Sequence, residues 1–300
     1  MRNRLVMAIC ILSLALTLGA CGNKEDNHDA SVPNTETNIV ENETSTQEET
    51  TSQEPTEVVE SETESETTPA IEESSPEIVA SGVLTDASIE WKIIGTTLYV
   101  SGTGAIPDFS TDPGVVEAHP HVYSAEDLRD WQTYYKTVEK VVIEDGITKI
   151  GQNNFANFVN AKEIVFADSV NEIGKWGCRN MGLDTINFNK VTKLGFNCFG
   201  CLQNLTRVRI PGTIKTVSEG CFVFCENLKE VYIENGVEVI DELAFSDVPA
   251  GCKFYIAESV TTIVDDALND YSVVYVKAGS KAEEIVNGFA DRYNITVIAE

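Results

Sequence analysis

The sequence has few basic residues and few histidines. Its 300 residues hold 21 Lys and Arg against 48 Asp and Glu, a formal net charge of −27, and all 3 histidines precede residue 122. Because nucleic-acid binding depends largely on cations that neutralise phosphates, this balance argues against a nucleic-acid partner. P-loop, Gly-x-Ser-x-Gly and His-Glu-x-x-His motifs are all missing from the chain. We therefore do not predict an enzyme.

Aromatic residues are missing from residues 22–80, which carry 17 acidic residues and Lys24 as their only base. Such a segment has too little apolar surface to offset the entropy cost of ordering it. We interpret residues 21–80 as a disordered acidic stalk rich in Ser, Thr and Glu, and a cation-binding or glycosylated tract is the alternative. Residues 81–300 are long enough for one folded domain.

The first twenty residues have the features of an export signal. Two arginines precede an apolar run from Leu5 to Leu18, which is too short to span a membrane comfortably and ends in small residues. The final Leu-Gly-Ala-Cys, closing at Cys21, resembles the lipobox of bacterial lipoproteins. This resemblance implies cleavage after residue 20, lipidation of Cys21 and anchoring at the outer face of a bacterial membrane or at the cell surface. An ordinary signal peptide with a chance cysteine is the alternative.

Apolar residues recur with a period of 20 to 23 residues between positions 138 and 276. Most copies resemble L-x-x-V-x-I, followed by apolar residues four, seven and twelve positions later. The period lies in the leucine-rich-repeat range, so we predict an α/β repeat fold, a leucine-rich-repeat solenoid of seven short parallel strands. The inward residue that ends each strand is Ile143, Phe166, Phe188, Ile210, Ile233, Ile256 or Val276.

One departure from the common leucine-rich repeat indicates which class of these repeats the chain resembles. The asparagine that usually follows the strand is missing, and residues 217–225 contain an apolar residue, then Phe, then Cys. These features resemble the BspA-like class of bacterial surface leucine-rich repeats over residues 138–276. The resemblance implies a surface scaffold, with adhesion or host-matrix binding in some members. The residues that replace the asparagine are Gly146, Ser169, Thr213, Gly236 and Ser259.

Both ends of the solenoid require covers, because a terminal coil exposes its apolar face. Residues 81–137 are predicted to form the N-terminal cap, with a β-hairpin over residues 89–101 and a short helix after Ser124. Residues 277–300 are predicted to form the C-terminal cap. There Ser280 begins a capping-box pattern, an amphipathic helix follows, and a terminal strand ends the chain.

Four cysteines come close to a zinc-binding pattern. Cys198 and Cys201 are followed by Cys221 and Cys225, with suitable short spacings inside each pair. The repeat also accounts for them, because cysteine is a good small core residue. We favour buried thiols and no cofactor; a zinc site and a Cys198–Cys221 disulfide between neighbouring coils remain the alternatives.

His119 and His121 could present two imidazoles to a metal. Asp108, Asp112 and Glu117 lie near them in the sequence. A His-x-His pair in a polar loop is more often incidental. The pair and the cysteines support a second hypothesis, that of an envelope hydrolase or metal-dependent enzyme.

One face of the strands offers a place for a partner. Side chains alternate along a strand, so the residue before the final apolar one points outward. The outward column is Val142, Val165, Asn187, Arg209, Tyr232, Tyr255 and Tyr275, with Arg207, Lys253 and Lys277 at neighbouring outward positions.

Tyrosine and arginine are favoured as interface anchors. We therefore predict a lipid-anchored cell-surface scaffold that binds an extracellular protein or glycan through this column. The alternatives for the tyrosines are stacking that serves only the sheet, or coverage by the C-terminal helix. A purely structural envelope component is the third hypothesis for the whole protein.

Overall fold

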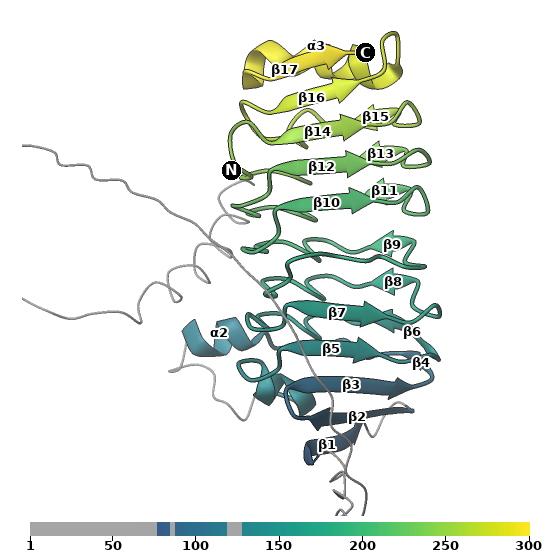
Figure 1. The fold of residues 1–300 in the computed structure, drawn as a ribbon, viewed down its shortest axis with the longest axis vertical. Helices are drawn as coiled ribbons and strands as arrows, with labels where there is room; N and C mark the ends of the chain where they lie inside the picture. Colours follow the sequence, from purple (N-terminus) through teal and green to yellow (C-terminus); the bar gives the residue numbers. More distant parts are fainter. Residues whose placement is uncertain (1–76, 85–87, 119–127) are drawn as a thin grey trace, which may run out of the picture. The chain divides into compact units, whose positions relative to one another are not determined.

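The computed structural model describes residues 77–84, 88–118 and 128–300, which form a stack of coils (Figure 1). In each main strand the second and fourth residues are buried and the other two reach the surface, as the repeat pattern predicts. This confirms a leucine-rich-repeat solenoid with parallel strands. The strands are β5 (Lys140–Ile143), β7 (Glu163–Phe166), β10 (Arg207–Ile210), β12 (Glu230–Ile233), β14 (Lys253–Ile256) and β16 (Val273–Val276).

Neighbouring coils pair in register, each residue opposite its equivalent one repeat later. Tyr232 pairs with Tyr255, and Tyr255 pairs with Tyr275. A second set of strands, all but β6 shorter than the main strands, follows the turn of the coils and forms separate parallel sheets. These strands are β4 (Gly104–Ala105), β6 (Ile147–Ile150), β8 (Glu172–Ile173) and β9 (Lys193–Leu194) in one sheet, and β11 (Thr216–Val217), β13 (Val239–Ile240) and β15 (Thr262–Ile263) in the other.

The third coil does not form its main strand, so the prediction of seven strands was wrong at this position. Leu183 and Phe188 are buried as predicted, but residues 185–188 have no strand conformation. The main sheet is therefore divided between β7 and β10.

The cause is a shorter turn after the third coil's inward residue. Val191 follows Phe188 by three positions, whereas the corresponding apolar residue follows by four in the neighbouring coils. Asn189 takes a left-handed backbone conformation with φ 47°, and its side-chain amide donates to the Phe166 carbonyl oxygen at 2.9 Å. One coil earlier, the backbone N–H of Ala167 makes the equivalent bond to Ile143. In the third coil the Asn189 side chain thus makes the bond that a backbone N–H makes one coil earlier.

Aromatic rings stack in the core of the middle coils. The ring of Phe222 lies between those of Phe199, at a centroid distance of 5.8 Å, and Phe245, at 5.3 Å. The rings are within 9° of parallel, and all three side chains are fully buried. The repeat therefore builds its core by placing like side chains on top of one another.

The N-terminal cap contains the predicted hairpin. β2 (Ile89–Ile94) and β3 (Thr97–Gly102) pair antiparallel, and β3 then pairs parallel with β5 of the first coil. A further strand, β1 (Ile78–Leu84), pairs with β2 and begins three residues before the predicted boundary at residue 81.

The rest of this cap contains two short helical segments. The segment η2 (Asp130–Tyr134) is a 3₁₀-helix and lies where the sequence predicts a short helix. The helix α2 (Pro113–Ala118) was not predicted. The fully buried ring of Trp131, within η2, contacts Trp91 of the hairpin and Phe155 of the first coil, so the cap shares the core of the solenoid.

The C-terminal cap follows the prediction. The hydroxyl of Ser280 accepts a hydrogen bond from the Glu283 N–H at 3.2 Å and caps helix α3 (Lys281–Tyr293). Strand β17 (Thr296–Ala299) then pairs parallel with β16 and ends the main sheet. Within the described residues, no helix combines the length and the apolar character needed to cross a membrane.

Truncating the central ring of the aromatic stack tests the packing of the coils. Phe222→Ala is expected to lower the free energy of unfolding by about 3–5 kcal/mol, because it removes a fully buried ring and leaves a cavity. Urea denaturation measures the change. Glu226→Ala is the control, because Glu226 is exposed. Its free energy of unfolding should stay within about 0.5 kcal/mol of that of the native chain. A loss under about 1 kcal/mol for Phe222→Ala would contradict this packing.

Candidate binding face

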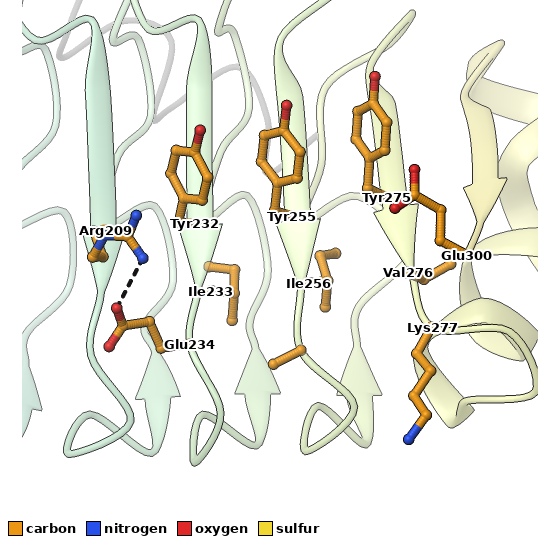
Figure 2. Close-up of a pocket in the computed structure, with 11 residues that line it drawn as sticks. Arg209, Tyr232, Ile233, Glu234, Tyr255, Ile256, Tyr275, Val276, Lys277 and Glu300 are labelled. Atoms are coloured by element: carbon orange, nitrogen blue, oxygen red, sulfur yellow. Dashed lines mark hydrogen bonds and ion pairs between the residues drawn. The ribbon is translucent and has the colours of Figure 1, made fainter.

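Three tyrosines form a ladder on the outward side of the main sheet (Figure 2). The ring centroids of Tyr232 and Tyr255 lie 4.6 Å apart and those of Tyr255 and Tyr275 lie 4.7 Å apart, with interplanar angles of 6° and 12°. The side chains are half-exposed and their hydroxyls point the same way. Since each inner ring face meets a neighbour, the ladder presents ring edges and hydroxyls to solvent. We call these three residues the tyrosine ladder.

Two arginines extend the ladder at its N-terminal end. The guanidinium of Arg209 lies 4.6 Å from the Tyr232 ring centroid, within cation–π range, and that of Arg207 lies 6.0 Å away. Arg209 is paired with Glu234 at 3.0 Å, as the dashed line in Figure 2 shows. The Arg207 Nε donates to Glu230 at 2.7 Å. These pairs hold both guanidinium groups against the same surface.

Local charges and partial desolvation shift pKa values on this face. The hydrogen bond from Arg207 holds the pKa of the Glu230 carboxyl below its usual value, and the positive charges of Arg207 and Lys253 add to the effect. Partial desolvation raises the pKa of Tyr255 above its ordinary value. The face therefore presents Glu230 as a carboxylate and Tyr255 as a neutral hydroxyl at neutral pH.

All seven residues predicted from the sequence lie on this face, in two adjoining concavities. The first, of about 410 Å³, is lined by the tyrosine ladder, Arg209 and Lys277, and Lys277 forms an ion pair with Glu258. The second, of about 780 Å³, is lined by Arg207 and Lys253, and Arg209 borders both. The C-terminal helix packs against β15 and β17 and leaves the ladder half-exposed, so the predicted alternative of coverage by this helix was wrong.

Several acidic residues of the face were not predicted. Glu230, Glu234 and Glu300 line the two concavities or pair with the arginines. The signal for Glu230 was present in the sequence, because it stands one repeat after Arg207 and directly opposite it in the register. The position of Glu300 depends on the pairing of the last strand and has no such signal.

The six cysteines in the described part of the chain are buried thiols. The Sγ atoms of Cys198 and Cys221 lie 3.4 Å apart, which is a thiol contact and not a disulfide. Burial, together with the hydrogen bond to Cys198, raises the pKa of the Cys221 thiol well above its ordinary value, and burial raises that of Cys252 to about 12. Such thiols are poor nucleophiles. Residues 77–84, 88–118 and 128–300 contain no group of three or more side chains arranged to hold a metal.

His119 and His121 lie outside the described residues, as do Cys21 and the predicted export signal. The carboxylates near the histidines have partners of their own. Asp112 forms a buried ion pair with Arg179 at 2.7 Å, and Glu117 pairs with Lys136 at 2.9 Å. The ion pair between Asp112 and Arg179 joins the segment that contains α2 to the second coil.

The family follows from the repeats. The family description "BspA type Leucine rich repeat region" matches the chain in 6 copies, over residues 130–253 and 189–296. The chain belongs to this family. It is thus a BspA-type leucine-rich-repeat scaffold, as the sequence resemblance implied.

The solved structures to which the chain is similar come from several bacteria. A leucine-rich repeat protein from Eubacterium ventriosum is 19% identical, with a TM-score of 0.41, and the match covers 66% of each chain. The T. pallidum leucine-rich repeat protein is 13% identical, with a TM-score of 0.40, over 74% of this chain and 96% of that one. A leucine-rich cell surface protein from Faecalibacterium prausnitzii is 14% identical, with a TM-score of 0.27, over 70% and 97%. A comparison with curated proteins returned no match.

Thiol labelling tests the state of the cysteines. In the native chain at pH 8, the six described cysteines are expected to resist iodoacetamide, because they are buried and the raised pKa of Cys221 and Cys252 keeps these thiols protonated. All six should react after unfolding in guanidinium chloride without a reductant. Peptide mass spectrometry reads each position. Recovery of a linked Cys198–Cys221 peptide would contradict the free-thiol state.

A substitution of the middle tyrosine, Tyr255, tests whether the stacked rings of the ladder stabilise the fold. Tyr255→Ala is expected to lower Tm by roughly 3–8 °C, because it removes both stacked ring contacts of the ladder. Tyr255→Phe keeps the stack and should leave Tm within about 2 °C of the native value. Calorimetry measures both. An unchanged Tm in the alanine variant would mean that the stacking does not stabilise the sheet.

Proposed function

We propose that the chain is a lipid-anchored cell-surface scaffold that binds an extracellular protein or glycan on the face of the tyrosine ladder. The observation that carries the proposal is a half-exposed row of three stacked tyrosines, flanked by Arg207 and Arg209, on a paired parallel sheet. Tyrosine and arginine supply much of the binding energy at known interfaces.

The packing of the ladder also favours binding because it lowers the entropy cost. Each ring is held by its neighbours at 4.6 to 4.7 Å, and Arg209 is held by Glu234 at 3.0 Å. Side chains ordered before the ligand arrives lose less freedom when it binds. The side chains of the face are therefore ordered before a partner binds. The same stacking that stabilises the sheet also supplies this order.

The location in this proposal rests on the first 80 residues of the sequence. The lipobox-like end at Cys21 supports an anchor, and residues 21–80 would span at most about 200 Å if fully extended. A stalk of that reach would carry the solenoid away from the membrane to meet a partner. The buried thiols supply no reactive group for the enzymatic alternative.

Differential capture tests the proposal. The immobilised full-length chain is exposed to envelope, culture and host-surface extracts beside a Tyr232→Ala, Tyr255→Ala, Tyr275→Ala triple variant. Tyr271→Ala is the control, because Tyr271 is 58% exposed and lies outside the ladder. We expect one partner to be captured by the native chain and the control, and at least about tenfold less by the triple variant.

Thermal melts of all three proteins accompany the capture, so that unfolding is not mistaken for lost binding. A Phe variant at the same three positions keeps the stacked rings and shows whether the hydroxyls contribute. Equal capture by a folded triple variant would contradict the assignment of the ladder as the binding face.

A further inference from the structure

We propose that the larger concavity beside the tyrosine ladder binds an acidic polysaccharide. This inference rests on the proposed function, since it names the class of ligand for the same face. We call the concavity the basic groove; it has a volume of about 780 Å³ and contains Arg207, Arg209, Lys229 and Lys253.

The groove lies beside the third coil, which lacks its main strand. Its wall on that side includes residues 184–186, which have no strand conformation. The opposite wall is formed by the first residues of β10, β12 and β14 and the residues just before them.

The groove has an excess of positive charge on a strongly acidic chain. Its lining includes four basic residues and two acidic ones, Asp184 and Glu230, whereas the whole chain carries a net charge of −27. Arg207 is paired with Glu230 and Arg209 with Glu234, but Lys229 and Lys253 are exposed and form no ion pair within the described part of the chain. A local positive potential in a concave surface attracts anions.

The lining favours a sugar polymer over an acidic peptide. Ile186 is the only apolar side chain among the lining residues, and protein interfaces depend on buried apolar or aromatic anchors. Thr185 and Thr206 add hydroxyls to the groove, and the adjoining ladder adds a row of phenol hydroxyls. Cations and hydroxyls together match the carboxylates or sulfates and the hydroxyls of an acidic polysaccharide.

The two concavities form one continuous path for a linear chain. Arg209 lines both, so the basic groove opens directly onto the ladder. From β10 to β16 the path crosses three strand spacings, about 14 Å. A short run of sugar residues would place its anionic groups on Lys229 and Lys253 and its hydroxyls along the tyrosines.

Direct binding to defined polymers tests this inference. The purified full-length chain is titrated with heparin as a sulfated probe, polygalacturonate as a carboxylated probe, dextran as the uncharged control and poly-L-glutamate as the peptide arm. We expect binding to at least one acidic polysaccharide that weakens as salt rises, and none to dextran. The Lys229→Gln, Lys253→Gln double variant should bind roughly ten- to thirtyfold more weakly.

The matched control changes two exposed lysines outside the groove, Lys190→Gln and Lys193→Gln, and should bind within about twofold of the native chain. If both double variants lost affinity for the polysaccharide equally, or if neither lost affinity, the groove would not be the binding site. Tighter binding of poly-L-glutamate would overturn the polysaccharide and indicate an acidic protein. Absence of polysaccharide binding would overturn the inference alone, because capture of a partner by the ladder is measured separately.

Discussion

The parallel register between neighbouring coils is the constraint on which the structure depends. Each residue lies opposite its equivalent one repeat later, so that Tyr232 stacks on Tyr255 outside the sheet and Phe222 stacks on Phe245 inside it. The same register sets Arg207 opposite Glu230. One repeat length therefore determines both the core and the binding face, because a slip of one residue would exchange the two sides of a strand.

The third coil shows what happens when that length changes. A turn shortened by one residue lets the side chain of Asn189 bond to Phe166 where a backbone N–H would otherwise bond, and the main sheet divides there. The buried residues Leu183 and Phe188 keep their places, so the core continues through the break. The surface does not continue, and the basic groove lies at the interruption. The larger of the two concavities thus lies beside a local irregularity in the repeat.

The repeat columns made most of the core, the strands and the tyrosine ladder predictable, because alternation along a strand is a local property. The loss of the third strand was missed because Leu183 and Phe188 keep the apolar spacing of the strand itself, although the sequence does show the shorter step from Phe188 to Val191. Strand β1 was missed because only Leu84 among its residues is buried. The ion pair of Asp112 with Arg179 joins residues 67 positions apart, and no local pattern indicates it.

Amide hydrogen exchange on the full-length chain tests most directly whether the interrupted register shapes the binding face. The account predicts slow exchange for the amides of Glu230–Ile233 and Lys253–Ile256, which belong to paired central strands. It predicts exchange at least about a hundredfold faster for residues 185–188, which have no strand partner within the described part of the chain. Equal protection of residues 185–188 and the two strands would show a continuous sheet through the third coil and would contradict the account.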